Sequence, residues 1–436
     1  MATTRSQGSD RTGEREPLFG DARTTDAQAQ GDNILNEDVS SEHVVVKVIS
    51  VMICFGSIGL YTASIGALIP LLETYYKIQD ATVAWIFVVQ VIGYLLGAAT
   101  LESIHLFAGR RGLALTTAGL QILGIAILAT KPIYSIALLA YFLFGIGTGC
   151  SDAGFCAWAA NVRDTNAVQG LIHGSYSVGC IIGPMIVAAL EKAGFGWNMF
   201  YMIMLGAFGI DFCTLLFAFR HDDGQAYRVT TRPHESEVEV TLAEGKRPII
   251  YCALFYLCYV GIETSFTDWL VTFMSRSRNS STYIAALTSS MFWGGMSIGR
   301  FTLGLAKAAG LRLIVIIYII LSLASQVLFR FHFHVAVSLS LAASIGFSFG
   351  PMFPAGIIML TSQLPKSLQV RACSIAASVG QLGGAGAPFL LGLVAQSLGI
   401  ERLLDLVLVM SVLLLLIWLG FSNPPLKPTK PLESED

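Results

Sequence analysis

IYSIALLAYFLFGIGTGCSDAGFCA, residues 133–157, is a run of 25 residues with a single charged side chain, Asp152. A helix needs about 20 mostly apolar residues to cross the hydrocarbon layer of a membrane. Inside that layer a helix is favoured because it satisfies its own backbone hydrogen bonds. The run therefore predicts a membrane-spanning helix that carries one carboxylic acid and several glycines.

Eleven further runs have the same character. The expected spans are 46–70, 82–104, 111–130, 133–157, 168–191 and 197–219, followed by 248–274, 281–306, 311–330, 333–361, 368–397 and 401–421. Charged residues make up 13% of the 436 residues, about half of the roughly 25% usual in soluble domains. We therefore expect an all-α membrane protein with twelve transmembrane helices, in contact with a lipid bilayer. No basic stretch suggests a nucleic-acid partner.

Polar segments divide the chain into five parts. Residues 1–45 form a polar tail that we expect to be disordered, because it cannot bury a core. Two six-helix halves follow at 46–219 and 248–421. The linker 220–247 is the only long polar stretch inside the chain, and 422–436 is a short tail rich in Pro and Lys.

An internal repeat relates the two halves. Gly109 and Arg111 recur as Gly310 and Arg312, an offset of 201 residues (310 minus 109). The same offset relates the pairs Gly145/Gly149 and Gly346/Gly350, and the tripeptide Ser-Val-Gly at 177–179 and 378–380. Glycines four apart form a flat face for close helix packing, which is useful where helices rock and equally where they only pack. Two parallel six-helix repeats are a transporter architecture with its binding site at the midplane between the halves.

Basic residues predict the orientation in the membrane. With a cytosolic N-terminus, 19 Lys and Arg fall on the cytosolic side and 7 on the far side, so both termini are expected in the cytosol. The sequon at Asn279 then lies outside, where it can be glycosylated. We expect a plasma-membrane location. The stretch 14–19, which is similar to an acidic di-leucine signal, keeps a vacuolar membrane open as the alternative.

The chain contains no pattern typical of an enzyme. There is no P-loop, no nucleophile elbow and no HExxH, so neither ATP-driven transport nor a catalytic residue is expected. All eight cysteines fall in apolar runs without a CxxC pair, which indicates buried free thiols. We therefore expect no cofactor and no metal.

Ionisable groups deep in a span are candidates for a substrate or proton site, because burial in the membrane costs several kcal/mol unless they are paired or wet. Asp152, Glu263 and Arg300 are the foremost of these. Asp152 has a packing or capping role as its structural alternative, and Glu263 has a role as a structural ion-pair or hydrogen-bond partner. Arg300 is a candidate salt-bridge gate, and its structural alternative is that it simply snorkels toward the cytosol. Asp211 and Asp268 are weaker candidates of the same kind.

Other side chains extend this list. His173 lies near the cytosolic start of a span and can titrate near neutral pH, although a histidine satisfied at a helix interface is the favoured reading. Trp158, Trp269 and Trp293 offer rings for stacking on a flat solute, or serve only as packing.

Residues 45–421 resemble the major facilitator superfamily, and FAGRRG (107–112) is similar to the family's loop between spans two and three. Leu106 stands where the family has an acidic residue. More narrowly, the chain resembles the fucose-permease-like branch, especially fungal members. The motifs are GLYTASIGALIP (59–70), GCSDAGFCAWAANV (149–162), LIHGSYSVGCIIGP (171–184), YVGIETSFTDWLVTFM (259–274) and FGPMFPAGI (349–357). The resemblance implies that Asp152, Glu263 and Trp269 belong to the site.

Two departures from that branch bear on the substrate. Tyr61-Thr62 replaces Asn-Asp in span one, and Phe155-Cys156 replaces Trp-Asn in span four, so the first half offers fewer polar groups. We therefore expect a monomeric, proton-coupled exporter of a partly apolar small molecule, such as a secondary metabolite, bound by Tyr61, Thr62 and the residues above. Proton-coupled uptake of a hexose-like sugar is the alternative, and a non-transporting sensor is a third, weaker reading.

Overall fold

The structure is a computed structural model that describes residues 41–159, 162, 165–225, 246–302, 310–332, 334–364 and 366–422. The expected tails, apart from their innermost residues, and most of the linker lie outside this part. The helices of the first half are α2 (Ser41–Tyr76), α3 (Asp80–Val83), α4 (Trp85–Ala129), α5 (Tyr134–Ala159), α6 (Thr165–Lys192) and α7 (Asn198–Ala218). Those of the second half are α9 (Lys246–Arg276), α10 (Thr282–Thr302), α11 (Leu311–Phe331), α12 (Val335–Phe349), α13 (Met352–Ser362), α14 (Lys366–Leu398) and α15 (Arg402–Phe421).

Helix α4 contains two of the expected spans, joined at Gly109. This glycine has φ 65 and ψ −160, a conformation outside the helical region that only glycine adopts without strain. On α5, positions 142 and 146 pack against Gly93 and Gly97, whereas Gly154 packs against Leu113 and Gly147 against Thr117. The first part of α4 therefore runs parallel to α5 and the second part antiparallel. Gly109 reverses the chain, as the position between two spans requires.

The predicted twelve spans agree with the helices. By length and composition, ten helical segments of the described residues could cross a membrane. One of them, Asp80–Ala129, has 50 residues and contains two spans. Helix α10 is absent from the ten because Ser, Thr and Gly lower its hydropathy, yet its 21 residues occupy the expected eighth span. The tenth span is broken at Gly350-Pro351 into α12 and α13, since proline cannot donate to the helical ladder.

The internal repeat is visible in the packing. A Cβ added to Gly93 would lie 2.3 Å from the carbonyl oxygen of Phe142, and one on Gly295 would lie 1.9 Å from that of Ala343. Positions 142 and 343 differ by the repeat offset of 201, and Gly93 and Gly295 differ by 202. Gly310, the counterpart of Gly109, also has a positive φ, of 78. The two halves therefore use the same close helix crossings and the same turn.

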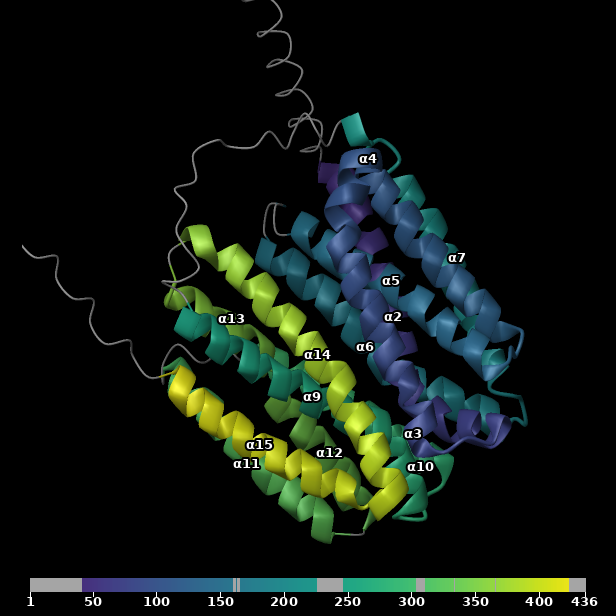
Figure 1. Cartoon of the computed structure of the whole chain (residues 1–436), viewed down its shortest axis with the longest axis vertical. Coiled ribbons are helices and arrows are strands. Elements are labelled where there is room, and N and C mark those ends of the chain that lie inside the picture. Colours follow the sequence, from purple (N-terminus) through teal and green to yellow (C-terminus); the bar gives the residue numbers. More distant parts are fainter. Residues whose placement is uncertain are drawn as a thin grey trace, which may run out of the picture.

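Figure 1 shows the first half (purple to blue-green) on one side and the second half (green to yellow) on the other, meeting near α3 and α10. We call the end with the start of α2, the Gly109 turn and the end of α7 the linker end. The opposite end, with α3 and the end of α9, is the loop end. Glycine brings the halves together there: a Cβ on Gly66 of α2 would lie 2.8 Å from the carbonyl oxygens of Thr267 and Asp268.

The cysteine expectation holds in part. All eight cysteines are free thiols, and Cys54, Cys150, Cys180, Cys252 and Cys258 are buried. Cys213 is exposed, and Cys156 and Cys373 are half-buried, so the prediction that all are buried was wrong for these three. An apolar run predicts a membrane span, but it does not say which side of the helix faces its neighbours.

Candidate functional site between the two halves

Asp152 heads a polar cluster on the first half. It lies half-buried on α5 and accepts a hydrogen bond from the hydroxyl of Tyr94 on α4. The thiol of Cys156, one turn further along α5, lies 3.6 Å from Asp152 Oδ1 and 3.9 Å from His173 Nε2 on α6. Three helices thus bring a carboxylate, a thiol and an imidazole together. The sequence singled out Asp152 and His173, but not the Tyr94 hydroxyl.

Arg300 of the second half joins this cluster. Its Nη1 donates to Ser177 Oγ on α6 at 2.7 Å, and the Ser177 hydroxyl donates to the carbonyl oxygen of His173 at 3.0 Å. Ser177 had been noticed only as a marker of the repeat. Arg300 also interacts electrostatically with Glu263 on α9, which lies one turn after Tyr259.

The structure therefore brings four sequence-predicted residues into one network that crosses between the halves: Asp152, His173, Arg300 and Glu263. An acid and an imidazole lie on the first half, and an acid and a guanidinium on the second. Such a set can bind and release protons and can hold a polar part of a solute. Any movement of the halves relative to each other changes the Arg300–Ser177 contact.

The contacts of Tyr61 and Thr62 lie outside this network in the described part of the chain. Tyr61 is fully buried inside the first half, with its ring stacked on Phe144 at 3.7 Å between centroids. Thr62 is half-buried and donates its hydroxyl to the Ile58 carbonyl oxygen of its own helix at 2.8 Å. Phe155 is also fully buried and packs on Phe219. Consecutive helical residues point about 100° apart, so motif neighbours do not share a face.

Trp269 and the weaker acidic candidates have packing positions. Trp269 is fully buried and its Nε1 donates to the Pro388 carbonyl oxygen of α14 at 3.0 Å. Asp268 is buried at the α2–α9 crossing. Asp211 of α7 is fully buried and accepts a hydrogen bond of 3.2 Å from Ser57 of α2.

Sequence reasoning missed a charged contact at the loop end, which we call the loop-end clasp: Arg276, Glu73 and Asp80. Arg276 at the end of α9 forms ion pairs with Glu73 of α2 and with Asp80 of α3, the second at 2.6 Å. The backbone N–H of Ala81 donates to Gln396 Oε1 of α14 at 3.1 Å beside it. These contacts join the two halves at this end. Arg276 had been counted only as a surface charge.

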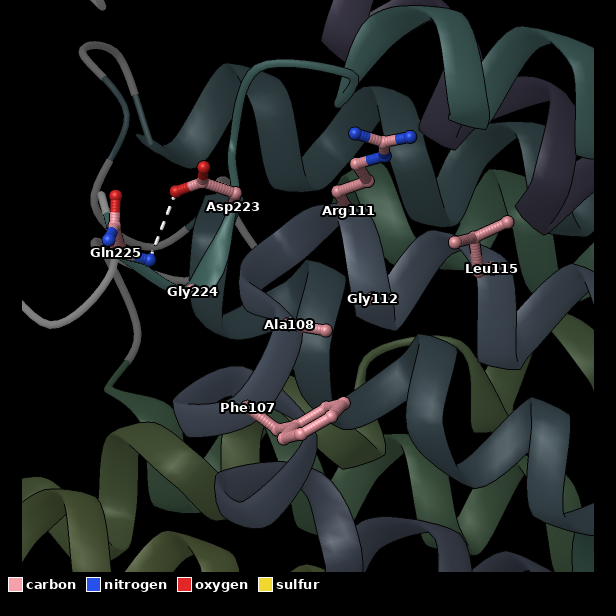
Figure 2. A pocket seen from close by; sticks show the side chains of 8 residues that line it. All are labelled: Phe107, Ala108, Arg111, Gly112, Leu115, Asp223, Gly224 and Gln225. Atoms are coloured by element: carbon pink, nitrogen blue, oxygen red, sulfur yellow. Dashed lines mark hydrogen bonds between the residues drawn. The ribbon is translucent and has the colours of Figure 1, made fainter.

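The GRRG turn has an acidic partner from another part of the chain. Asp222, just after α7, pairs with Lys47 at 3.0 Å and Arg110 at 3.6 Å, and its carbonyl oxygen accepts the Arg111 N–H at 2.9 Å. Asp222 thus supplies a negative charge where Leu106 replaces the family's acid. A surface depression of about 370 Å³ lies at this turn. Figure 2 shows the residues that line it: Phe107, Ala108, Arg111, Gly112 and Leu115 of α4, with Asp223, Gly224 and Gln225. It lies at the linker end, and none of the residues that line it belongs to the polar cluster.

Asn279 lies at the loop end in the turn between α9 and α10. Its side chain is exposed and its φ is 49, a left-handed conformation that Asn tolerates better than most residues. This position is compatible with the expected glycosylation.

Comparison with known proteins agrees with this architecture. The family model of the Major Facilitator Superfamily matches residues 51–385 of this chain. The chain is similar to Bypass of stop codon protein 6 of Saccharomyces cerevisiae, with 27% identity covering 86% of this chain and 82% of that protein. It is also similar to the Glucose/mannose transporter GlcP of Bacillus subtilis, with 23% identity covering 78% of this chain and 85% of that protein.

Solved structures show the same fold. The crystal structure of a single-substitution mutant of the nucleoside transporter NupG has a TM-score of 0.69 at 12% identity, covering 87% of this chain and all of that one. A second crystal structure of NupG has a TM-score of 0.66. The family and the helical membrane-protein fold agree with the expectations from sequence. The chain therefore belongs to the major facilitator superfamily and is a membrane transporter of a small substrate.

Proposed function

We propose that this transporter couples proton movement to the export of a small, partly apolar organic molecule by alternating access. The observation that carries the proposal is the network of Asp152, His173, Arg300 and Glu263 between the halves. Its central hydrogen bond joins Arg300 of one half to Ser177 of the other, at 2.7 Å. A transporter whose halves rock must break this bond.

The two acids give the network its proposed coupling role. A carboxylic acid surrounded by protein favours its neutral form, and a neighbouring cation favours the charged form. Asp152 contacts Tyr94, and Glu263 interacts with Arg300. Movement of the halves would change these surroundings, and this change is the proposed link between proton movement and transport.

The surroundings of the network favour a partly apolar ligand. Tyr176 and Trp293 form an edge-to-face pair from α6 to α10, with centroids 6.1 Å apart, close to Ser177 and Arg300. A hexose has many hydroxyls, and each one left unpaired on burial costs about 1–3 kcal/mol. Two such losses weaken binding by a factor of roughly 30 to 10,000. A flat body with one or two polar groups fits better.

The proposal also covers the oligomeric state of the protein, its orientation and the membrane in which it lies. We infer a monomer with both termini in the cytosol, the loop end outside, and a plasma-membrane or, as the alternative, a vacuolar location. In that orientation the loop-end clasp lies on the outer side, and Asn279 is open to glycosylation. Reporter tags on each terminus, probed in intact cells, test this; a tag accessible from outside would contradict it.

The functional test compares metabolites retained by cells that lack the gene with those of cells that carry it. The retained compound is then supplied to proteoliposomes under an imposed pH gradient. Asp152→Asn and Glu263→Gln are expected to abolish pH-driven accumulation and to keep solute exchange. Asp405→Asn is the matched control, because this acid pairs with Arg330 and Arg402 at the loop end, outside the network. Unchanged pH dependence in both test variants would exclude coupling through these acids.

Proton-coupled uptake of a hexose-like sugar is the second candidate. The similarity to a glucose/mannose transporter favours it. Growth and uptake with labelled hexoses separate the two. Loss of uptake of one hexose in cells without the gene, restored by the intact gene, would favour the sugar transporter and contradict export of an apolar metabolite.

A further inference from the structure

Arg300 has neutral hydrogen-bond partners, although it lies inside the bundle. Its Nη1 donates to the Ser177 hydroxyl at 2.7 Å and its Nη2 to the thioether sulfur of Met296 at 3.5 Å. A guanidinium has five N–H donors, and a thioether is a weak acceptor. The ion pairs found among the described residues do not include Arg300. Most of its donor capacity is therefore not used by strong acceptors.

Arginines at the loop end differ in this respect. Arg276 pairs with two carboxylates, and Arg330 pairs with Asp405 at 2.6 Å. Arg278 donates to the backbone carbonyl oxygens of Phe329 and His332. Arg278 and Arg330 are half-buried like Arg300, yet they have the better acceptors. The weak hydrogen-bond acceptors around Arg300 are thus particular to the polar network.

Trp293, on the same helix, has a second unused donor. Its ring is 3% exposed, and its Nε1 has no hydrogen-bond partner in the part of the chain that the structure describes. A buried donor left without a partner costs about 1–3 kcal/mol, so such groups are uncommon unless something else satisfies them. Trp293 precedes Arg300 by seven residues, or two helical turns, which is roughly 10 Å along one face. This α10 donor face consists of Trp293 and Arg300.

The α10 donor face meets α6 of the other half. Trp293 contacts the Tyr176 ring edge to face at an interplanar angle of 78°, and Arg300 contacts Ser177. The end of the donor face at Trp293 is therefore aromatic, and the end at Arg300 is cationic. Both Trp and Arg side chains donate hydrogen bonds and accept none. A ligand that satisfies this face must offer acceptors and a flat apolar body.

Building on the proposed function, we propose that the α10 donor face binds an organic acid, with the carboxylate at Arg300 and an aromatic or similarly flat body against Tyr176 and Trp293. A carboxylate matches the planar guanidinium in two parallel hydrogen bonds, which are about twice as strong as neutral ones. An acceptor group on the body would satisfy Trp293 Nε1. The substrate class is thus a small aromatic or flat-bodied carboxylate.

Glu263 competes with the bound carboxylate for Arg300 in this arrangement. Its carboxylate already interacts electrostatically with Arg300. A bound organic anion lies in the field of the same guanidinium and is repelled by the Glu263 charge. Replacing Glu263 with Gln removes this negative charge at nearly the same volume, so it should strengthen binding of the anion and leave a neutral analogue unaffected.

The test measures binding of 4-phenylbutyrate and of its neutral analogue 4-phenylbutyramide to the purified full-length protein in detergent, by calorimetry. We expect the acid to bind roughly tenfold or more tightly than the amide. Arg300→Gln should bring the two affinities to within about threefold of each other, and Arg300→Lys should retain part of the preference. Glu263→Gln should strengthen binding of the acid alone, by roughly threefold or more.

Arg402→Gln is the matched control, because Arg402 lies at the loop end and pairs with Asp405 in the same helix. It should keep the preference for the acid. Binding of the amide by Arg300→Gln shows that this variant is folded. Equal affinity of the unaltered protein for both probes, binding of neither, or a preference that survives Arg300→Gln would overturn the proposal. No gradient is imposed, so failure of proton-coupled export in proteoliposomes would not alter this result, and equal binding here would not exclude export.

Discussion

Arg276→Gln is predicted to open the loop end of the bundle. The clasp consists of one guanidinium, 42% exposed, and two carboxylates that are 6% and 11% exposed, Glu73 and Asp80. Glutamine keeps much of the side-chain volume and removes the charge. The two nearly buried carboxylates then remain close together without the cation between them. Separation of the halves at this end lets water reach them.

The magnitude follows from the exposure of the three side chains. An exposed ion pair contributes about 0.2–1 kcal/mol, whereas removing one partner of a fully buried pair costs about 3–5 kcal/mol. The clasp has two pairs with an exposed cation and buried anions, so we expect about 1–3 kcal/mol. This corresponds to a shift of roughly 5- to 140-fold in the ratio of open to closed loop ends.

Spin labels on the two halves measure this ratio. Ile133 and Leu398 suit the labels, because both lie at the loop end in different halves and are 67% and 66% exposed. Replacing the exposed Cys213 with Ser lowers background labelling. Pulsed electron resonance should show a longer distance in Arg276→Gln than in the parent protein.

Two comparisons make the result specific. Arg402→Gln removes an arginine of the same end that pairs with Asp405 three residues away within one half, so it should leave the distance unchanged. Changing Glu73 and Asp80 to Gln and Asn together with Arg276→Gln removes the stranded charges and should partly restore the short distance. Identical distance distributions in Arg276→Gln and the parent, or an equal shift in Arg402→Gln, would refute the reasoning.

Three further substitutions test packing. Gly295→Ala places a Cβ 1.9 Å from a carbonyl oxygen of α12 and should prevent stable folding. Gly294→Ala meets nothing within 4 Å and should be neutral. Equal yields of the two variants in size-exclusion chromatography would contradict this expectation. Asp222→Ala removes the carboxylate beside the buried Lys47 and should lower the free energy of unfolding by about 3 kcal/mol. The loss is measured as a fall in the thermal unfolding midpoint, and Asp222→Asn should reproduce only part of it. Trp269→Phe removes a buried indole hydrogen bond to α14 and should cost about 1 kcal/mol or more by the same assay; an unchanged midpoint would count against that bond.

The candidate site was predictable for the ionisable side chains only. Asp152, His173, Glu263 and Arg300 stand out in a sequence because charge and imidazole are rare in apolar spans. Tyr94, Ser177 and Tyr259 do not stand out, since hydroxyls are common in these helices. Tyr61 was chosen by its place in a motif and lies instead against Phe144. Motif position identifies a helix and a depth, but the facing direction depends on the neighbouring helices.

Sequence alone determined the spans, the family and the twofold repeat, because the bilayer acts on local composition and length and because duplication leaves a constant offset. Tertiary structure decided which side chains meet. Arg276 and Glu73 are 203 residues apart, and Arg300 and Ser177 are 123 apart. In each pair the two residues come from different halves and are far apart in the sequence. Their meeting depends on how glycine faces let the helices approach, and on a relative position of the halves that no local pattern of residues encodes.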